Sequence, residues 1–208
     1  MAEARSAETP AERLSFVAFA RLVVDALEAC EITYLIGGAV AVWAWGEART
    51  TRDFDLVIHL PSERIRQLSQ ELAARRMLVP PDILFDLLIQ PEGDLPVNAI
   101  HLDAGYKAEI FQLRLNDTFR LSALQRRRLV DLEEPLGQVY VHAPDDLILN
   151  KVHYYSLSQQ TKHIRDIASI LLFSAKEIDW DYFDSWLQRL HLQPAWDEVK
   201  QEVDRLLR

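Results

Sequence analysis

The chain has 208 residues, 49% of them hydrophobic, which is enough for one sizeable core but would be crowded as two full domains. Its formal net charge of -9 argues against indiscriminate binding to nucleic acid or to an anionic membrane, so neither a DNA nor a membrane partner is expected. The single cysteine, Cys30, excludes an internal disulfide. No apolar run approaches the roughly 20 residues of a membrane span, and no secretory segment opens the chain. We therefore expect a soluble, cytoplasmic protein.

The first 30 residues predict a short tail and one helix. Residues 1–10 are small or polar and are expected to be disordered. Thr9-Pro10-Ala11-Glu12 is typical of a helix start, because a capping residue precedes a proline at the first helical position. Apolar residues then recur at helical spacing from Phe16 to Leu27.

Residues 34–58 have the pattern strand, turn, helix, strand. A short apolar run at 34–36 ends at Gly37-Gly38, an apolar segment of helical length covers 39–45, and a second apolar run begins at Asp53. Because strand side chains alternate, Asp53 and Asp55 share one face. Two carboxylates about 4 Å apart repel by roughly 4 kcal/mol at an effective dielectric near 20. A Mg²⁺ or Mn²⁺ ion between them would reverse the sign of that interaction.

The glycine pair suits a phosphate. Without Cβ atoms, Gly37 and Gly38 let the backbone turn sharply into a helix N-terminus and present N–H groups to an anion. A dinucleotide-binding turn is the alternative, but Ala39 and Val42 occupy two positions at which that motif requires glycine. The sequence therefore predicts a phosphate cradle and a metal site one helix apart.

The rest of the chain alternates strands and helices and then becomes helical. Helices are predicted at 62–77 and 82–90, and strands at 97–102, 106–113, 127–132 and 139–142. From residue 144 onward the predicted helices are 144–155, 160–173, 182–190 and 194–207. The expected fold class is α+β with an α/β core: a mixed sheet flanked by helices over residues 11–143, then a helical C-terminal part over residues 144–208.

Ile36-Gly37-Gly38, a helix and Asp53-Phe54-Asp55 together resemble the motif of the nucleotidyltransferase fold of the polymerase β type. The resemblance is to its small bacterial members, which are related to abortive-infection and toxin nucleotidyltransferases. It implies a nucleotidyltransferase-like mixed sheet. The spacer between Gly38 and Asp53 has 14 residues, about one more than the usual family pattern.

The resemblance also implies a third carboxylate from a neighbouring strand. The segment 105–111 would supply it as Glu109, where related sequences usually carry Asp. Alternation puts Glu109 on the same face as Lys107 and Phe111, so it can join the Asp pair only if the two strands are neighbours in register. Asp103 is the alternative third acid, although its position favours a role in the turn at 103–105.

Two helical segments extend the resemblance. Residues 143–151 and 163–167 are similar to the helical element after the family core, which implies nucleotide-binding roles for Lys151 and Asp166. A salt bridge that clamps two helices explains these two residues equally well. Thr51 and Arg52 precede the Asp pair and are further candidates for phosphate contact, although such a loop is also an ordinary solvated turn.

Residues 104–130 form a locally basic region. It contains six Lys or Arg and two acids, a local charge of +4. Either it attracts a polyanion such as RNA, or it is a strand edge protected by charge. The basic residues are Lys107, Arg114, Arg120, Arg126, Arg127 and Arg128.

These features predict a metal-dependent nucleotidyltransferase. Asp53, Asp55 and Glu109 would be the catalytic residues and hold Mg²⁺ or Mn²⁺, while Gly37 and Gly38 would bind a nucleoside triphosphate. The resemblance leaves the acceptor open among an RNA end, a protein hydroxyl and a small molecule such as an aminoglycoside. It also implies a cognate toxin or antitoxin partner. The alternative is a catalytically inactive module of the same fold that binds nucleotides or neutralises a toxin.

Overall fold

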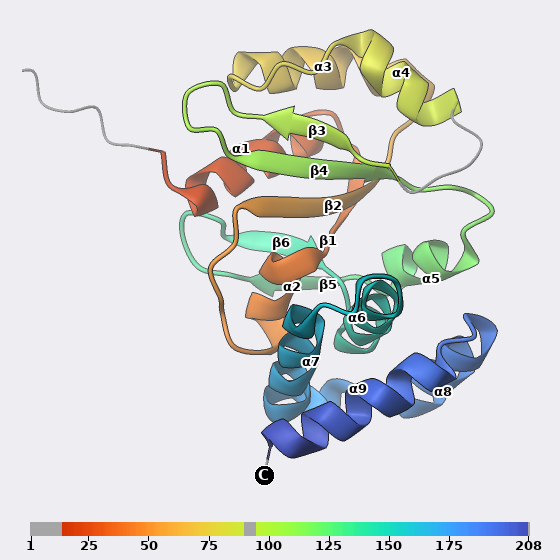
Figure 1. Cartoon of the computed structure of the whole chain (residues 1–208). Helices are drawn as coiled ribbons and strands as arrows, with labels where there is room; N and C mark the ends of the chain where they lie inside the picture. Colours follow the sequence, from red (N-terminus) through yellow and green to blue (C-terminus); the bar gives the residue numbers. More distant parts are fainter. Residues whose placement is uncertain (1–13, 90–94, 208) are drawn as a thin grey trace, which may run out of the picture.

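The computed structural model describes residues 14–89 and 95–207. Within these ranges the strands form one mixed, six-stranded sheet in the order β3-β4-β2-β1-β6-β5, with helices around it (Figure 1). The α+β class is therefore confirmed. The strands are β1 (Thr33–Ile36), β2 (Asp53–His59), β3 (Val97–Ile100), β4 (Lys107–Gln112), β5 (Arg128–Asp131) and β6 (Gln138–Val141).

The helices lie in two groups at opposite ends of the sheet, with α1 and α2 between them (Figure 1). Helices α3 and α4 lie beside β3 and β4, and α6 to α9 lie beyond the other end. The α-helices are α1 (Phe16–Ala29), α2 (Gly38–Trp45), α3 (Ile65–Ala74), α4 (Pro81–Ile89), α5 (Thr118–Arg126), α6 (Pro144–Ser158), α7 (Thr161–Ser174), α8 (Trp180–Arg189) and α9 (Gln193–Leu206). Short 3₁₀ turns are η1 (Ser62–Arg64) and η2 (Ala175–Glu177).

Helix α1 has a serine cap at its start. It starts at Phe16, and the hydroxyl of Ser15 caps it by accepting a hydrogen bond from the Ala18 N–H at 3.1 Å. The predicted start at Thr9-Pro10, and the disorder expected for residues 1–10, lie outside the described residues.

Helix α5 was not predicted. Its local signals are weak: the Asp117 side chain caps it by accepting from the Arg120 N–H at 2.9 Å, and only Phe119, Ala123 and Leu124 are buried. A helix with so few core residues has a low contrast between its faces, so its hydrophobic periodicity is hard to recognise.

The strand directions bring four chain segments to one edge of the sheet. Strand β1 is antiparallel to β2 and parallel to β6, while β2 is parallel to β4. The carboxyl ends of β1 and β6 therefore lie beside the amino ends of β2 and β4. Gly37, His142, Asp53 and Lys107 stand at these ends, so this edge collects the predicted site.

The C-terminal helices share the hydrophobic core of the sheet. Leu147, Ile148 and Val152 of α6 are buried and belong to the same cluster as Ile36 and Phe54 of the sheet. The division into 11–143 and 144–208 stays a prediction, but the core crosses that boundary.

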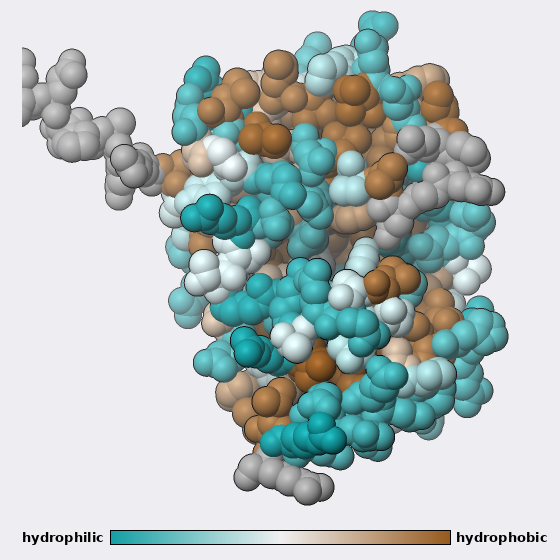
Figure 2. Space-filling view, in the orientation of Figure 1, coloured by the Kyte–Doolittle hydropathy of each residue, from teal (hydrophilic) through white to brown (hydrophobic). Residues whose placement is uncertain are grey.

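Apolar side chains gather on the surface at the end of the sheet near β3. Figure 2 shows hydrophobic side chains gathered over α3 and α4, and Ile83, Phe85 and Ile89 of α4 are exposed. Within the described ranges, no helix is long and apolar enough to cross a membrane.

Candidate active site

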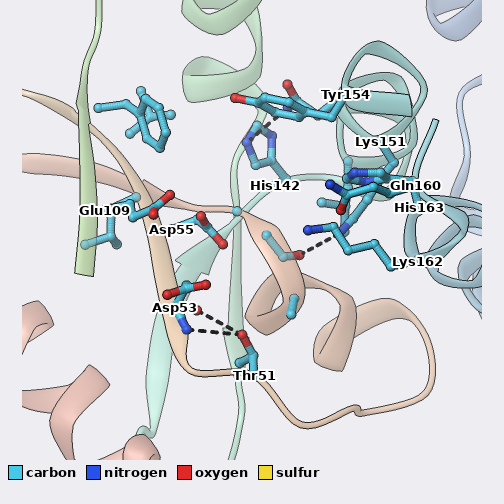
Figure 3. A pocket seen from close by; sticks show the side chains of 18 of the residues that line it. Thr51, Asp53, Asp55, Glu109, His142, Lys151, Tyr154, Gln160, Lys162 and His163 are labelled. Carbon is cyan, nitrogen blue, oxygen red and sulfur yellow. Dashed lines mark hydrogen bonds between the residues drawn. The ribbon is translucent and has the colours of Figure 1, made fainter. Parts of the chain in front are cut away.

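The two strands that carry the predicted carboxylates are neighbours in register. Strands β2 and β4 run parallel, with Asp55 opposite Glu109 and Asp53 opposite Lys107. The condition that the sequence left open for Glu109 is therefore met, and Figure 3 shows the three carboxylates along one wall of a pocket. The alternative acid, Asp103, instead forms an ion pair with Arg76 at 2.7 Å.

The Asp55 carboxylate lies directly against the glycine turn. Gly38 is the first residue of α2 and has a φ of +57°, in the left-handed region that favours glycine. A Cβ atom there would lie 1.7 Å from Asp55 Oδ2. Only glycine fits this position without moving the carboxylate.

The other glycine corrects part of the predicted phosphate cradle. The Gly37 N–H donates to the Asp55 carbonyl at 2.9 Å, so its donor is already used. The N–H groups that could still bind a phosphate are therefore those at the start of α2, because the first N–H groups of a helix have no intrahelical partners.

A cavity of about 420 Å³ opens between the sheet edge and helices α6 and α7. Of the predicted residues, Gly37, Gly38, Thr51, Asp53, Asp55, Glu109 and Lys151 line it. Arg52 and Asp166 are not among the lining residues, so the structure does not bring them to the cavity. Arg120 of the predicted basic region and Arg49 of the loop before β2 also line it. The lining residues that the sequence did not indicate include His142, Asn150, Tyr154, Lys162 and His163.

Lys151 and Asp166 form the salt bridge that was the alternative explanation for them. Lys151 Nζ is 2.6 Å from Asp166 Oδ2 and 3.1 Å from the Gly38 carbonyl oxygen. Arg49 binds the same carboxylate through Nε at 2.7 Å and Nη2 at 3.1 Å. Asp166 is buried and accepts from both cations, which ties α6 and α7 to the loop before β2.

His142 is a buried neutral side chain at the end of β6. Burial, with the charges of Arg120 and Lys151, lowers its pKa to about 3. Its Nε2 lies 3.3 Å from Asn150 Nδ2, and its Nδ1 has no hydrogen-bond partner. The sequence does show a histidine directly after an apolar strand, which is a common place for a site residue. It does not show that β6 pairs in parallel with β1, and this pairing is what brings His142 to the cavity.

Asp55 is the site carboxylate whose pKa is clearly raised. Burial raises its pKa to about 6, the negative charges of Glu109 and Asp53 add to the rise, and the Lys151 ammonium opposes it. Perturbed carboxylates inside a cavity are typical of functional sites, so Asp55 is a candidate on physical grounds as well as by motif.

The positive charge nearest the other two carboxylates comes from Lys107. Its Nζ lies 2.5 Å from Glu109 Oε1 and 3.2 Å from Asp53 Oδ1. Within residues 14–89 and 95–207, no three His, Cys, Asp or Glu side chains form a group that could hold a metal ion as they stand. The carboxylates thus share one wall but do not form a closed metal cage.

The basic side chains of residues 104–130 have different partners in different parts of the molecule. Lys107 pairs with the site carboxylates, Arg126 is held by two buried carboxylates of α6, and Arg127 lies over the Tyr140 ring at 4.6 Å. Arg128 is exposed on β5, the last strand of the sheet order. The region fits a charged strand edge at Arg128 better than one continuous basic lobe.

Solved structures of the antibiotic-resistance factor ANT(2'')-Ia have a similar fold. The solution structure of the antibiotic-resistance factor ANT(2'')-Ia has a TM-score of 0.55 at 16% identity and covers 84% of this chain and 94% of its own. The crystal structure of ANT(2'')-Ia in complex with adenylyl-2''-tobramycin has a TM-score of 0.56 at 16% identity, with coverage of 84% and 98%. A nucleotidyltransferase-like protein from Paracoccidioides brasiliensis has a TM-score of 0.47 at 18% identity, with coverage of 88% and 91%.

Comparison by sequence adds nothing to these similarities: no protein-family model matches the chain, and no curated protein does. The similarity is therefore one of fold. The chain has a fold similar to that of ANT(2'')-Ia.

Proposed function

We propose that the protein is a divalent-metal-dependent nucleotidyltransferase that moves a nucleoside monophosphate from a triphosphate to an acceptor hydroxyl. The observation that carries the proposal is the register of Asp55 opposite Glu109, with the Asp55 carboxylate against Gly38 at a cavity of about 420 Å³. Cavities of this size are typical of small-molecule sites. The similarity to ANT(2'')-Ia, whose crystal structure contains an adenylylated product, supports the same reaction class.

The donor set fits Mg²⁺ or Mn²⁺. Asp53, Asp55 and Glu109 offer carboxylate oxygens, the ligands that hard dications prefer, from three adjacent positions of β2 and β4. Burial, together with the negative charges of Glu109 and Asp53, raises the pKa of Asp55, and a cation at the site would offset both effects. A bound ion would neutralise phosphate charge and lower the pKa of the acceptor hydroxyl.

The residues of the chain would then position the reactants. The first N–H groups of α2, at the cavity wall, would bind phosphate oxygens. Thr51 would join them by turning its hydroxyl away from the Asp53 carbonyl oxygen, to which it donates at 3.1 Å. The acceptor oxygen forms a bond to the α-phosphorus, and the bond from that phosphorus to the bridging oxygen breaks. Pyrophosphate leaves with the electron pair, and the hydroxyl proton passes to a carboxylate of the site.

The charges of the side chains that line the cavity indicate which class of acceptor fits. Besides Asp53, Asp55 and Glu109, the charged side chains of the lining are basic. They are Arg49, Arg120, Lys151 and Lys162. A polycationic acceptor such as an aminoglycoside would meet like charges beyond the metal ligands, so an RNA end, a protein hydroxyl or an uncharged small molecule fits better. A cognate toxin or antitoxin partner remains a prediction from the family resemblance.

A label-transfer assay tests the proposal. Each α-labelled triphosphate is incubated with the protein and Mg²⁺ or Mn²⁺, separately with total RNA, with lysate proteins, with the small-molecule fraction of a lysate and with tobramycin. We expect transfer to RNA, to protein or to a small molecule of the lysate, none to tobramycin, and loss of transfer in Asp55→Asn. The matched control is Asp86→Asn, which removes one carboxylate from the exposed face of α4.

The second candidate is an inactive nucleotide-binding or antitoxin-type module. The observation that favours it is the Lys107 ammonium, which already forms ion pairs with both Asp53 and Glu109. Triphosphate binding without transfer to any acceptor would select this module over the enzyme.

A further inference from the structure

The ammonium of Lys107 stands between two of the three candidate metal ligands. Its position follows from the strands: Lys107 is the register partner of Asp53 across β2 and β4, and it lies two residues before Glu109 on the same face. The resulting distances are 3.2 Å to Asp53 Oδ1 and 2.5 Å to Glu109 Oε1. The contact is thus a consequence of strand register.

The third ligand has a different environment. The carboxylate of Asp55 lies deeper, where a Cβ atom on Gly38 would touch its Oδ2. The negative charge of Glu109 still helps to raise the pKa of Asp55, although Glu109 accepts a hydrogen bond from Lys107. The site therefore divides into an outer pair, Asp53 and Glu109, which holds an internal cation, and an inner carboxylate, Asp55.

We propose that Lys107 is an internal competitor of the divalent cation: its ammonium occupies the outer carboxylate pair and must leave before a metal ion can use all three ligands. This inference rests on the proposed function, because it takes Asp53, Asp55 and Glu109 as metal ligands. The flexible stem of a lysine suits the role. The Lys107 side chain is 32% exposed, so its head can move into solvent without becoming a buried unpaired charge.

The competition has a consequence for the order of binding. Free Mg²⁺ gives up its water reluctantly, and it is usually held by one or two carboxylates together with substrate phosphates. A free ion would have to displace Lys107 and gain only carboxylates, whereas an ion carried by a triphosphate brings phosphate oxygens with it. Because of Lys107, the site binds a free metal ion weakly but binds a metal ion that is carried by a triphosphate well.

Calorimetric titration with Mn²⁺ in the absence of nucleotide tests the competition. We expect Lys107→Met to bind Mn²⁺ roughly tenfold more tightly than the wild type, because an attractive competitor of unit charge has been removed. Lys107→Arg keeps the cation and should bind no more tightly than the wild type. The matched control, Lys176→Met, removes the same charge from exposed η2 and should leave Mn²⁺ affinity unchanged. Unchanged or weaker Mn²⁺ binding by Lys107→Met overturns the proposal.

Thermal melting in EDTA gives an independent readout. Lys107→Met should melt at a lower temperature than the wild type, because Asp53, Asp55 and Glu109 then repel one another without a cation. Mn²⁺ should raise the melting temperature of this variant more than that of the wild type. A purely structural lysine would lower the melting temperature without the larger Mn²⁺ effect, and that result counts against the competitor role.

Asp55→Asn separates failure of this inference from failure of the proposed function. If Mn²⁺ binding with nucleotide depends on Asp55 but Lys107→Met binds free Mn²⁺ no more tightly, only the inference fails. If Asp55→Asn changes Mn²⁺ binding neither with nor without nucleotide, the metal-dependent function fails, and the inference fails with it.

Discussion

At the scale of single residues, Gly38 has the strictest steric requirement in the candidate site. We expect Gly38→Ala to displace the Asp55 carboxylate, because the new Cβ would lie 1.7 Å from Oδ2. The variant should lose more than tenfold in affinity for the metal–triphosphate complex, a loss above about 1.4 kcal/mol, measured by calorimetry.

Gly105→Ala is the control for this substitution. Gly105 also has a positive φ, +69°, but nothing lies within 4 Å of a Cβ atom placed there. Both variants should lose about 1–2 kcal/mol of stability from the left-handed conformation. Only Gly38→Ala should lose binding, and an equal loss of affinity in both variants would contradict the steric explanation.

His142 makes a second residue-scale prediction, on pH dependence. Burial lowers its folded-state pKa from 6.5 to about 3. Between these two pH values His142 is therefore protonated in the unfolded chain but neutral in the folded chain. Its contribution to folding is therefore present above pH 6.5 and decreases as the pH falls toward 3. Between pH 7.5 and pH 5 the loss is about 2 kcal/mol.

Urea unfolding of the wild type and of His142→Gln over this pH range measures that contribution. Other titrating groups are common to both proteins and cancel in the difference. We expect the stability of the wild type relative to His142→Gln to fall as the pH is lowered. A difference that does not change with pH would mean that the pKa of His142 is the same in the folded and unfolded chains, which contradicts the prediction.

At the scale of elements, Arg126 joins α5 to α6 and α8. Its guanidinium forms ion pairs with the buried Asp145 and Asp146 of α6, and it lies 3.6 Å from the ring centre of Tyr182 in α8. The Tyr182 hydroxyl donates to Asp146 Oδ1 at 2.6 Å. Removing one partner of a buried ion pair leaves an uncompensated charge.

We therefore expect Arg126→Met to lower the free energy of unfolding by about 3–5 kcal/mol at pH 8. Burial raises the pKa of Asp146 to about 7. Below that pH its carboxyl is protonated and uncharged in the folded chain, so loss of the guanidinium leaves less uncompensated charge. The stability that this raised pKa supplies is present at low pH and is lost as the pH rises from about 4 through 7. The defect should be smaller at pH 5 than at pH 8 in urea unfolding, and Arg128→Met on exposed β5 should show neither effect.

At the scale of the whole molecule, the sheet and the C-terminal helices share one core. Leu147, Ile148 and Val152 of α6 pack in the cluster that contains Ile36 and Phe54. We expect the full chain to unfold in a single calorimetric transition and a fragment that ends at residue 143 to show no cooperative transition. A fragment that unfolds cooperatively near the melting temperature of the full chain would support two independent units.

The sequence by itself determined the local features: the helix and strand types, the glycine turn and the alternation that puts Asp53 and Asp55 on one face. It did so because hydrophobic periodicity and glycine conformation act over a few residues. Helix α5 was missed because its periodic signal is weak.

Only the tertiary structure decided which strands are neighbours. The pairing of β2 with β4 brought Glu109 opposite Asp55 and Lys107 opposite Asp53, and the pairing of β6 with β1 brought His142 to the same edge. Strand order and register depend on contacts between residues far apart in the chain, which no local pattern encodes. For this reason the motif predicted where two acids lie, and the fold alone supplied the lysine between the outer carboxylates.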